Sequence, residues 1–279
     1  AILTYISYNG KDFYVMQDNS RDKFRGTGEA YTEEICDASR VKEMIGEVQG
    51  MTRNREFTKE EQAQIEFFAK NRKRWRFDQE TYGPYGLQYA VYDLDGDGRL
   101  ELITTVCMGT GLFSENRFYQ MGEDGKTLET LNQRELPDRE NQDSLDSDGY
   151  DLGWSMDAYR DSKGRTYYSG SNISRNGAAF HGVIQGFFYL EGDMVTFQDI
   201  CYSTSEAASN NVDTIDTYYD MDGNEIPKEA YDLLLSDFVK GMEQGKAYIN
   251  WFPDSDVTKD TDDVWEQRLA QSYRYALYY

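Results

Sequence analysis

The sequence has little of the chemistry that metal centres and catalytic sites commonly use. It contains one histidine, His181, and three cysteines, Cys36, Cys107 and Cys201, in 279 residues. One histidine cannot build a histidine-rich metal site, and three scattered cysteines fit neither a disulfide scaffold nor a zinc site. Each cysteine stands in an apolar segment and is expected to act as a small core residue. One bridge between two of them stays open, without a preferred pair.

Motifs for nucleophilic catalysis and phosphate binding are missing as well. The chain has no Gly-x-Ser-x-Gly, and the glycine-containing stretch at 108–112 lacks the Lys-Ser/Thr that follows a phosphate-binding loop. A carboxylate pair for glycoside hydrolysis can be neither chosen nor excluded among 51 acidic residues. No catalytic residue is therefore assigned, and the sequence favours a protein that is not an enzyme without deciding the matter.

Basic residues are in short supply, and so are long apolar runs. The chain has 29 basic against 51 acidic residues, a formal net charge of −22, which disfavours binding to nucleic acid and to anionic membrane surfaces. The basic cluster at 70–76 stands at the end of a predicted helix, where it complements the helix dipole. The sequence predicts no transmembrane segment. The chain begins at Ala1 and not at Met, so we expect that a leader peptide was removed or omitted.

What the chain does have is enough apolar surface to fold. Hydrophobic residues make up 39% of it and aromatic residues 15%, including 23 tyrosines. This content favours a folded protein over a disordered one, and tyrosine suits half-buried strand surfaces. With no linker-like stretch in the sequence, we predict a single α+β domain over residues 1–279.

The predicted elements place helices on both sides of a central antiparallel sheet. Asn9-Gly10 between two apolar runs predicts a hairpin. Apolar residues three or four apart predict a helix from Thr32 to Gly50, and Thr58 with Glu61 forms a capping box that opens a second helix. The predicted parts are a helical portion at 31–80, a loop hairpin at 87–107, a β-meander at 116–222 and C-terminal helices at 227–279.

The most specific stretch is an acidic loop between two apolar runs. It carries carboxylates at Asp93, Asp95 and Asp97, a glycine at Gly98 and another carboxylate at Glu101. Calcium prefers six to eight oxygen ligands, and carboxylates at alternate positions of a tight loop supply them. A glycine at the sixth position allows the sharp turn that such a loop needs. The spacing therefore predicts a calcium site.

The remaining ligand positions separate this loop from a helical EF-hand. Arg99 at position 7 would offer its backbone carbonyl, and Glu101 at position 9 its carboxylate. Position 12, where an EF-hand keeps a bidentate glutamate, is Thr104. The flanking runs at 89–92 and 100–106 are β-branched and aromatic, which favours strands over helices. An EF-hand-like loop between two strands is the prediction.

Asp-x-Asp-x-Asp-Gly-x-x-Glu between two strands resembles the calcium loops of FG-GAP and VCBS-type repeats. The wider segment, Tyr-Asp-Leu-Asp-Gly-Asp-Gly-Arg-Leu-Glu-Leu-Ile, is similar to one found in exported proteins of unknown function from clostridia-like Gram-positive bacteria. The resemblance spans the loop and its flanks, and one good copy does not imply a propeller. It implies a structural Ca²⁺ held by Asp93, Asp95, Asp97, Arg99 and Glu101. An acidic turn without an ion is the alternative, which mutual repulsion of the carboxylates disfavours.

A second acidic stretch, at 143–151, also offers carboxylates and a glycine. It lacks the regular spacing of the first loop, so a solvated surface loop is favoured there over a second cation site. The turn at 220–224 copies the first half of the calcium loop but has no later carboxylate. It is predicted to be a plain turn.

The function that these features favour is an exported, calcium-stabilised protein at the cell surface, secreted or held as a lipoprotein. It would bind an extracellular ligand or partner, carbohydrate or protein, without chemistry. Two alternatives stay open: a carbohydrate-active hydrolase that uses a carboxylate pair, and a purely structural or interaction domain.

Overall fold

The computed structural model describes residues 2–8, 11–17, 33–36, 56–82, 86–108, 113–134, 150, 152–153, 155–176, 180–207, 214–257 and 259–278. Contacts divide the chain into two compact units, residues 1–54 and residues 55–279. The division lies inside the portion at 31–80 that the sequence predicts to be helical, and a single domain over 1–279 stays a prediction.

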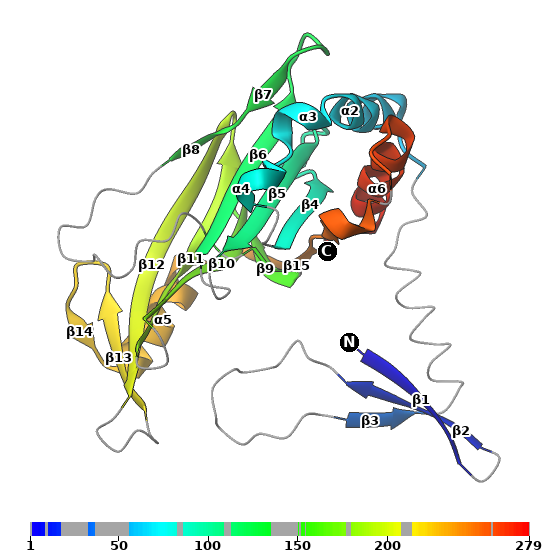
Figure 1. Ribbon diagram of the computed structural model, residues 1–279. Helices are drawn as coiled ribbons and strands as arrows, with labels where there is room; N and C mark the ends of the chain where they lie inside the picture. The colour runs from blue at the N-terminus through cyan, green and yellow to red at the C-terminus, as the bar shows by residue number, and fades with distance from the viewer. Residues whose placement is uncertain are drawn as a thin grey trace. The chain divides into compact units, whose positions relative to one another are not determined.

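The first unit contains a three-stranded antiparallel sheet (Figure 1) in the order β1 (Ile2–Tyr8), β2 (Lys11–Gln17), β3 (Glu33–Cys36). The pairing of β1 with β2 confirms the predicted hairpin. The helix predicted from Thr32 to Gly50 is wrong at Glu33–Cys36, which is a strand. Ile35 lies opposite Val15 in that strand pair, so pairing with an apolar strand outweighs helical spacing there. The rest of that predicted helix lies outside the described residues.

The second unit has two sheets. A five-stranded sheet has the order β16-β4-β5-β6-β7 and a nine-stranded sheet the order β14-β13-β12-β11-β10-β9-β15-β17, with β8 parallel to β12. The strands of the smaller sheet are β4 (Gly86–Tyr92), β5 (Glu101–Met108), β6 (Phe113–Met121), β7 (Leu128–Thr130) and β16 (Phe252–Pro253). Those of the larger sheet are β8 (Asn132–Arg134), β9 (Ser155–Arg160), β10 (Thr166–Asn176), β11 (Phe180–Glu191), β12 (Met194–Ala207), β13 (Thr214–Asp220), β14 (Glu225–Ile226), β15 (Glu243–Tyr248) and β17 (Leu277–Tyr278).

Helices precede and follow most of these strands. They are α2 (Lys59–Lys70), α3 (Arg72–Trp75), α4 (Gln79–Tyr82), α5 (Lys228–Phe238) and α6 (Asp262–Tyr275), with a 3₁₀ turn η2 at Asp254–Asp256. The capping box that the sequence predicts for α2 is present: Thr58 Oγ1 accepts from the backbone N–H of Glu61, and Glu61 Oε2 accepts from that of Thr58. None of the helices in the described part of the chain is long and apolar enough to span a membrane.

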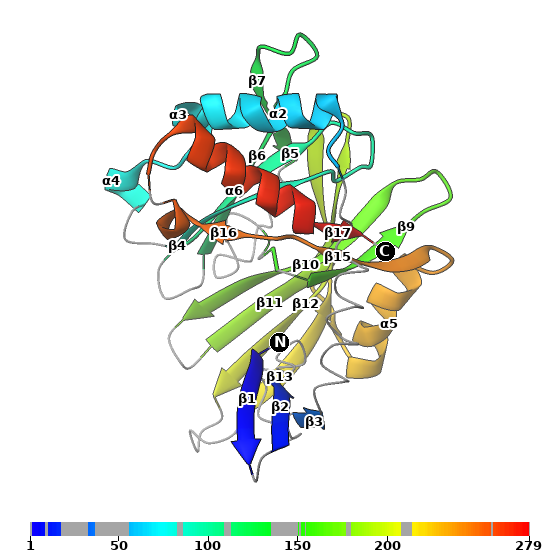
Figure 2. The ribbon, with the colours of Figure 1, turned by 90° about the vertical axis from the view of Figure 1, so that its right-hand side faces the viewer.

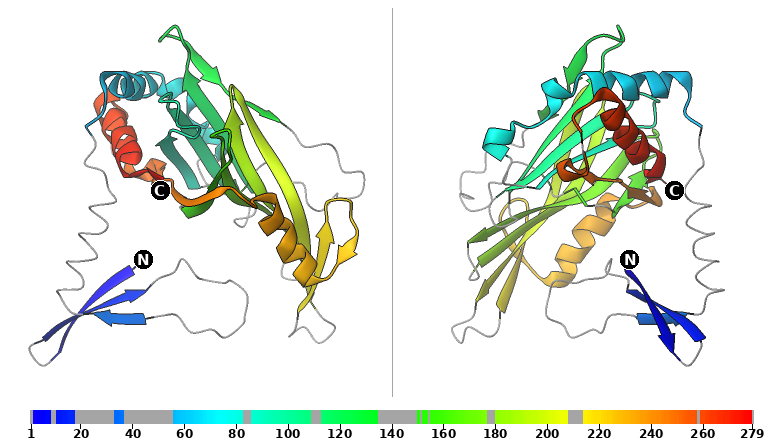
Figure 3. Two further views of the ribbon diagram at one scale, coloured as in Figure 1. Left: turned by 180° about the vertical axis from the view of Figure 1, so that it is seen from behind. Right: turned by 45° about the vertical axis from the view of Figure 1, so that its right-hand side comes forward.

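The two sheets and the helices form layers. The five-stranded sheet lies between the nine-stranded sheet and the helices α2 and α6, while α5 packs against β12 and β13 (Figures 1, 2 and 3). One core cluster fills the space between the sheets and includes Ile103, Phe118 and Phe188. A second cluster lies beneath the helices and includes Trp75, Tyr89 and Trp265. Both faces of the five-stranded sheet are therefore buried.

An α+β fold is confirmed, with one correction to its sheet. The predicted meander at 116–222 divides between the two sheets, because β6 and β7 join β5 while β9 to β13 form the larger sheet. The portion predicted as C-terminal helices at 227–279 contains α5 and α6 but also the strands β15, β16 and β17. These strands pair with partners distant in sequence, β15 with β9 and β16 with β4.

Candidate cation-binding loop

The acidic loop connects two adjacent strands of the five-stranded sheet. Strands β4 and β5 are antiparallel partners, and their last pair before the loop is Tyr92 with Glu101. The strand prediction for both flanks is thus confirmed. Between them the chain brings one carboxylate oxygen each of Asp93, Asp95 and Asp97 within 4.8 Å of one another.

The backbone of the loop is folded around its own carboxylates. Gly96 and Gly98 have φ angles of 77° and 87°, a region that favours glycine. Asp93 Oδ1 accepts a hydrogen bond of 2.9 Å from Gly96 N, and Asp97 Oδ1 one of 2.6 Å from Arg99 N. Asp95 Oδ1 accepts from Asp97 N at 3.2 Å. The glycines let the loop turn tightly enough to bring the three carboxylates together.

The crowded carboxylates shift one another's titration. Burial, and then the charges of Asp95 and Asp97, raise the pKa of Asp93 to about 6. Burial and the charge of Asp97 also raise the pKa of Asp95. Such shifts mean that ionising the loop costs free energy unless a positive charge is added nearby.

Glu101, the fourth predicted carboxylate ligand, is fully buried. Its Oε2 accepts a hydrogen bond of 2.6 Å from Leu94 N, and its Oε1 accepts one from the Gln120 side chain. Burial raises the pKa of this carboxyl group well above its usual range. Glu101 thus supports the start of the loop, and its assignment as a cation ligand stays a prediction.

Arg99 directs its side chain to Glu129, with Arg99 Nη2 and Glu129 Oε2 3.6 Å apart. The predicted use of its backbone carbonyl as a ligand stays a prediction.

Two residues that sequence reasoning missed hold the loop from opposite layers. Gln64 of α2 donates from Nε2 to Gly98 O at 3.0 Å and accepts at Oε1 from Leu100 N at 2.7 Å. Tyr168 of β10 donates from its hydroxyl to Leu94 O at 2.6 Å. In the sequence only the spacing of Gln64 four residues before Phe68, on one face of the predicted helix, hints at such a role.

Calcium fits this donor set. All three carboxylates offer hard oxygens, and oxygens that share one Ca²⁺ at about 2.3–2.6 Å are at most about 5 Å apart. The 4.8 Å spread of the three side chains lies within that limit. Asp93, Asp95 and Asp97 would hold the ion. Its positive charge would favour the ionised form of Asp93 and Asp95, whose pKa is raised without it.

The two weaker acidic stretches differ from this loop. The stretch at 143–151 lies outside the described residues except for Tyr150. In the turn after β13, Asp220 Oδ1 accepts from the backbone N–H groups of Asp222 and Asn224. Both this pattern and the chain reversal to β14 agree with the predicted plain turn.

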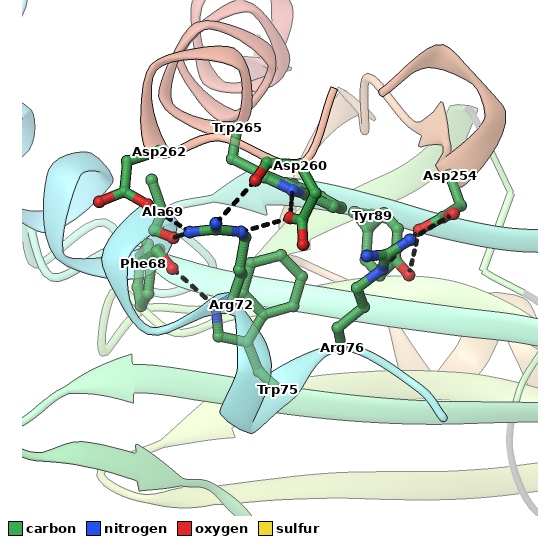
Figure 4. A network of polar contacts seen from close by, with 10 residues as sticks. All are labelled: Phe68, Ala69, Arg72, Trp75, Arg76, Tyr89, Asp254, Asp260, Asp262 and Trp265. Carbon is green, nitrogen blue, oxygen red and sulfur yellow. Dashed lines mark hydrogen bonds and ion pairs between the residues drawn. The ribbon is translucent and has the colours of Figure 1, made fainter. Parts of the chain in front are cut away.

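Two residues of the basic cluster at 70–76, Arg72 and Arg76, take part in a polar network between α3 and the segment that leads into α6 (Figure 4). Arg72 pairs with Asp260 and Asp262, and Arg76 with Asp254. These contacts hold two helical segments together, which favours a structural role over a binding patch. Further hydrogen bonds extend the network. Tyr89 donates to Asp254 and Trp265 to Asp260, while the backbone carbonyls of Phe68 and Ala69 accept from Trp75 and Arg72.

The acidic loop is thus the arrangement in the described residues that best fits a ligand. No family model, curated protein or solved structure matches this chain.

Proposed function

We propose that the loop at 93–101 binds a structural Ca²⁺ and that the protein is exported and works at the cell surface. The observation that supports the calcium site most is the convergence of Asp93, Asp95 and Asp97 between two strands that are buried on both faces. An ion there would fix the connection between the central strands β4 and β5. Calcium at the millimolar level found outside cells fills sites of this kind.

Within this proposal the protein is not catalytic and binds an extracellular ligand or partner, carbohydrate or protein. The net charge of −22 supports an aqueous, cation-rich setting over contact with nucleic acid. The resemblance of the loop to those of FG-GAP and VCBS-type repeats, and to exported proteins of clostridia-like bacteria, belongs to the same proposal. The antiparallel strands, arranged in two sheets with helices before and after them in the chain, would be the frame that presents the loop.

Thermal unfolding with calcium and with chelator tests the site. A ligand at about a hundred times its Kd stabilises the folded state by roughly 2.7 kcal/mol. We expect calcium to raise the unfolding midpoint of the wild type by several degrees and to leave an Asp95→Ala, Asp97→Ala variant unchanged. An Asp220→Ala, Asp222→Ala variant is the matched control, since it removes two carboxylates from an acidic turn without a predicted site. It should respond to calcium as the wild type does.

A wild type that does not respond to calcium would show that the loop is only an acidic turn. Export is tested separately, by determining whether the precursor carries a secretion or lipoprotein leader. A precursor without either would remove the cell-surface part of the proposal and leave the calcium site standing.

A further inference from the structure

We infer that Gln64 locks the loop at 93–100 to helix α2, so that loop and helix open and close as one unit. The lock itself is independent of any ion. Its extension to calcium, by which an ion on the loop would also stabilise the docking of α2, rests on the proposed function.

The lock consists of one side-chain amide that uses both of its ends. Gln64 is 5% exposed, and it bonds Gly98 O at 3.0 Å and Leu100 N at 2.7 Å. The two bonds enclose Arg99 and resemble the pair that a neighbouring strand would make. The side chain therefore fixes the half of the loop that leads into β5.

Of the two backbone groups, the Leu100 N–H cannot easily exchange its partner for water. Leu100 is fully buried in the core beneath the helices, so withdrawing Gln64 would leave the Leu100 N–H in an apolar environment without an acceptor. A buried polar group without a partner is strongly disfavoured. Release of the loop from Gln64 and undocking of α2 are then coupled, because each exposes the same groups.

The other half of the loop is fixed to a different layer. Leu94 packs into the core between the sheets, with its carbonyl bonded to Tyr168 of β10. Leu94 thus lies in the core between the sheets and Leu100 in the core beneath the helices, so the loop connects α2, the five-stranded sheet and the nine-stranded sheet. A ligand that orders it changes the stability of both contacts, and this coupling acts in both directions by thermodynamic linkage.

Hydrogen exchange of the full chain tests the lock, first in chelator. Gln64→Leu keeps the size of the side chain and removes both bonds, while Gln64→Glu keeps an acceptor for Leu100 N and removes the donor to Gly98 O. Gln62→Leu is the matched control. Gln62 stands two positions before Gln64 on the same helix, and its side chain donates to Glu266 of α6 at 2.7 Å and not to the loop.

We expect Gln64→Leu to speed exchange at both 93–100 and 59–70 by about tenfold, since the lost bonds leave a buried group unpaired. Gln64→Glu should fall between it and the wild type, and Gln62→Leu should leave the loop unchanged. Faster exchange in the loop without any change in α2, or no change in either, would overturn the lock.

The same measurement with calcium tests the extension. In the wild type calcium should slow exchange in both the loop and α2, and in Gln64→Leu it should slow exchange in the loop alone. Protection confined to the loop in the wild type would overturn the coupling while supporting the ion. A wild type that gives no response in either segment would overturn the proposed calcium site, and the lock would still be decided by the result in chelator.

Discussion

A carboxyl group that is fully buried either gives up its charge or depends on positive charge nearby. Glu101 is such a group, and its two oxygens accept hydrogen bonds from Leu94 N and from the Gln120 side chain. If its main role is to support the loop, a neutral side chain of the same shape should replace it. If it is a cation ligand, loss of its charge should weaken calcium binding.

We expect Glu101→Gln to change the free energy of unfolding in chelator by less than about 1 kcal/mol, because the amide can still accept from Leu94 N. Glu101→Ala should cost about 2–4 kcal/mol, since it leaves Leu94 N unpaired and opens a cavity. Urea unfolding of the two variants measures both values. An equal loss in the two would show that the negative charge itself is needed, and a calcium titration of Glu101→Gln then decides its role as a ligand.

The raised pKa of Asp93 predicts how stability depends on pH without a cation. Its folded value of about 6 lies above the usual value for an unfolded chain. Between these values the folded state binds more protons than the unfolded state, so this group makes the protein less stable as pH rises from about 4 to about 6. The cost persists above that range.

Because other groups titrate too, the test compares wild type with Asp93→Asn in chelator. At pH 7 the variant should be more stable than the wild type, by an amount on the order of 1 kcal/mol after allowance for solvent screening. At pH 4 this advantage should largely disappear. Denaturant unfolding at the two pH values measures it, and an advantage that is equal at both would contradict the assigned shift. With calcium present at pH 7 the wild type should be the more stable protein.

At the residue scale the spacing of the loop predicts the three aspartates, because a local pattern fixes a local turn. It does not predict Gln64, which stands 34 positions before Gly98. A glutamine on a helix is ordinarily a surface residue, and only the packing of α2 on the five-stranded sheet brings it to the loop. The sequence does not predict the contact of Tyr168 with the loop either, since a tyrosine in a strand has many possible partners.

At the scale of elements, prediction succeeds where the signals are local. The capping box at Thr58 and the hairpin around Asn9-Gly10 both depend on neighbours in the chain, and both are present. The sequence predicts a helix at residues 33–36 because the apolar spacing there also suits one. Their strand depends on pairing with β2, which the spacing within one segment cannot reveal.

One element contact offers a sharp mutational test. Gly186 of β11 lies under Tyr150, and a Cβ there would be 2.3 Å from the Tyr150 hydroxyl and 2.2 Å from Gln198 O. The backbone oxygen cannot move aside cheaply, so we expect Gly186→Ala to lower the free energy of unfolding by about 2–3 kcal/mol. Chemical denaturation provides the measurement.

Gly86→Ala is the control, because no heavy atom lies within 4 Å of its added Cβ. It should change stability by less than about 0.5 kcal/mol. A Gly186→Ala variant as stable as this control would show that Tyr150 and Gln198 do not approach β11 as closely as described.

At the scale of the whole molecule, the class of fold follows from the sequence but its layers do not. Alternating apolar residues give a strand two faces, yet they do not say which sheet the strand joins. The strands of 116–222 divide between two sheets, and β15 crosses back to pair with β9. These pairings join segments that are far apart in the chain, which local patterns do not encode.

The division into two units leads to a final prediction. Strands β1 to β3 pair with one another, and each described sheet of 55–279 is made of strands from that unit. A segment whose strands pair only with one another should tolerate removal of its neighbour. We therefore expect residues 55–279, produced alone, to fold and to unfold within about 3 °C of the corresponding transition of the full chain. Circular dichroism during heating measures this. A fragment that aggregates, or that loses its cooperative transition, would show that residues 1–54 complete its core and would favour the single domain that the sequence predicts.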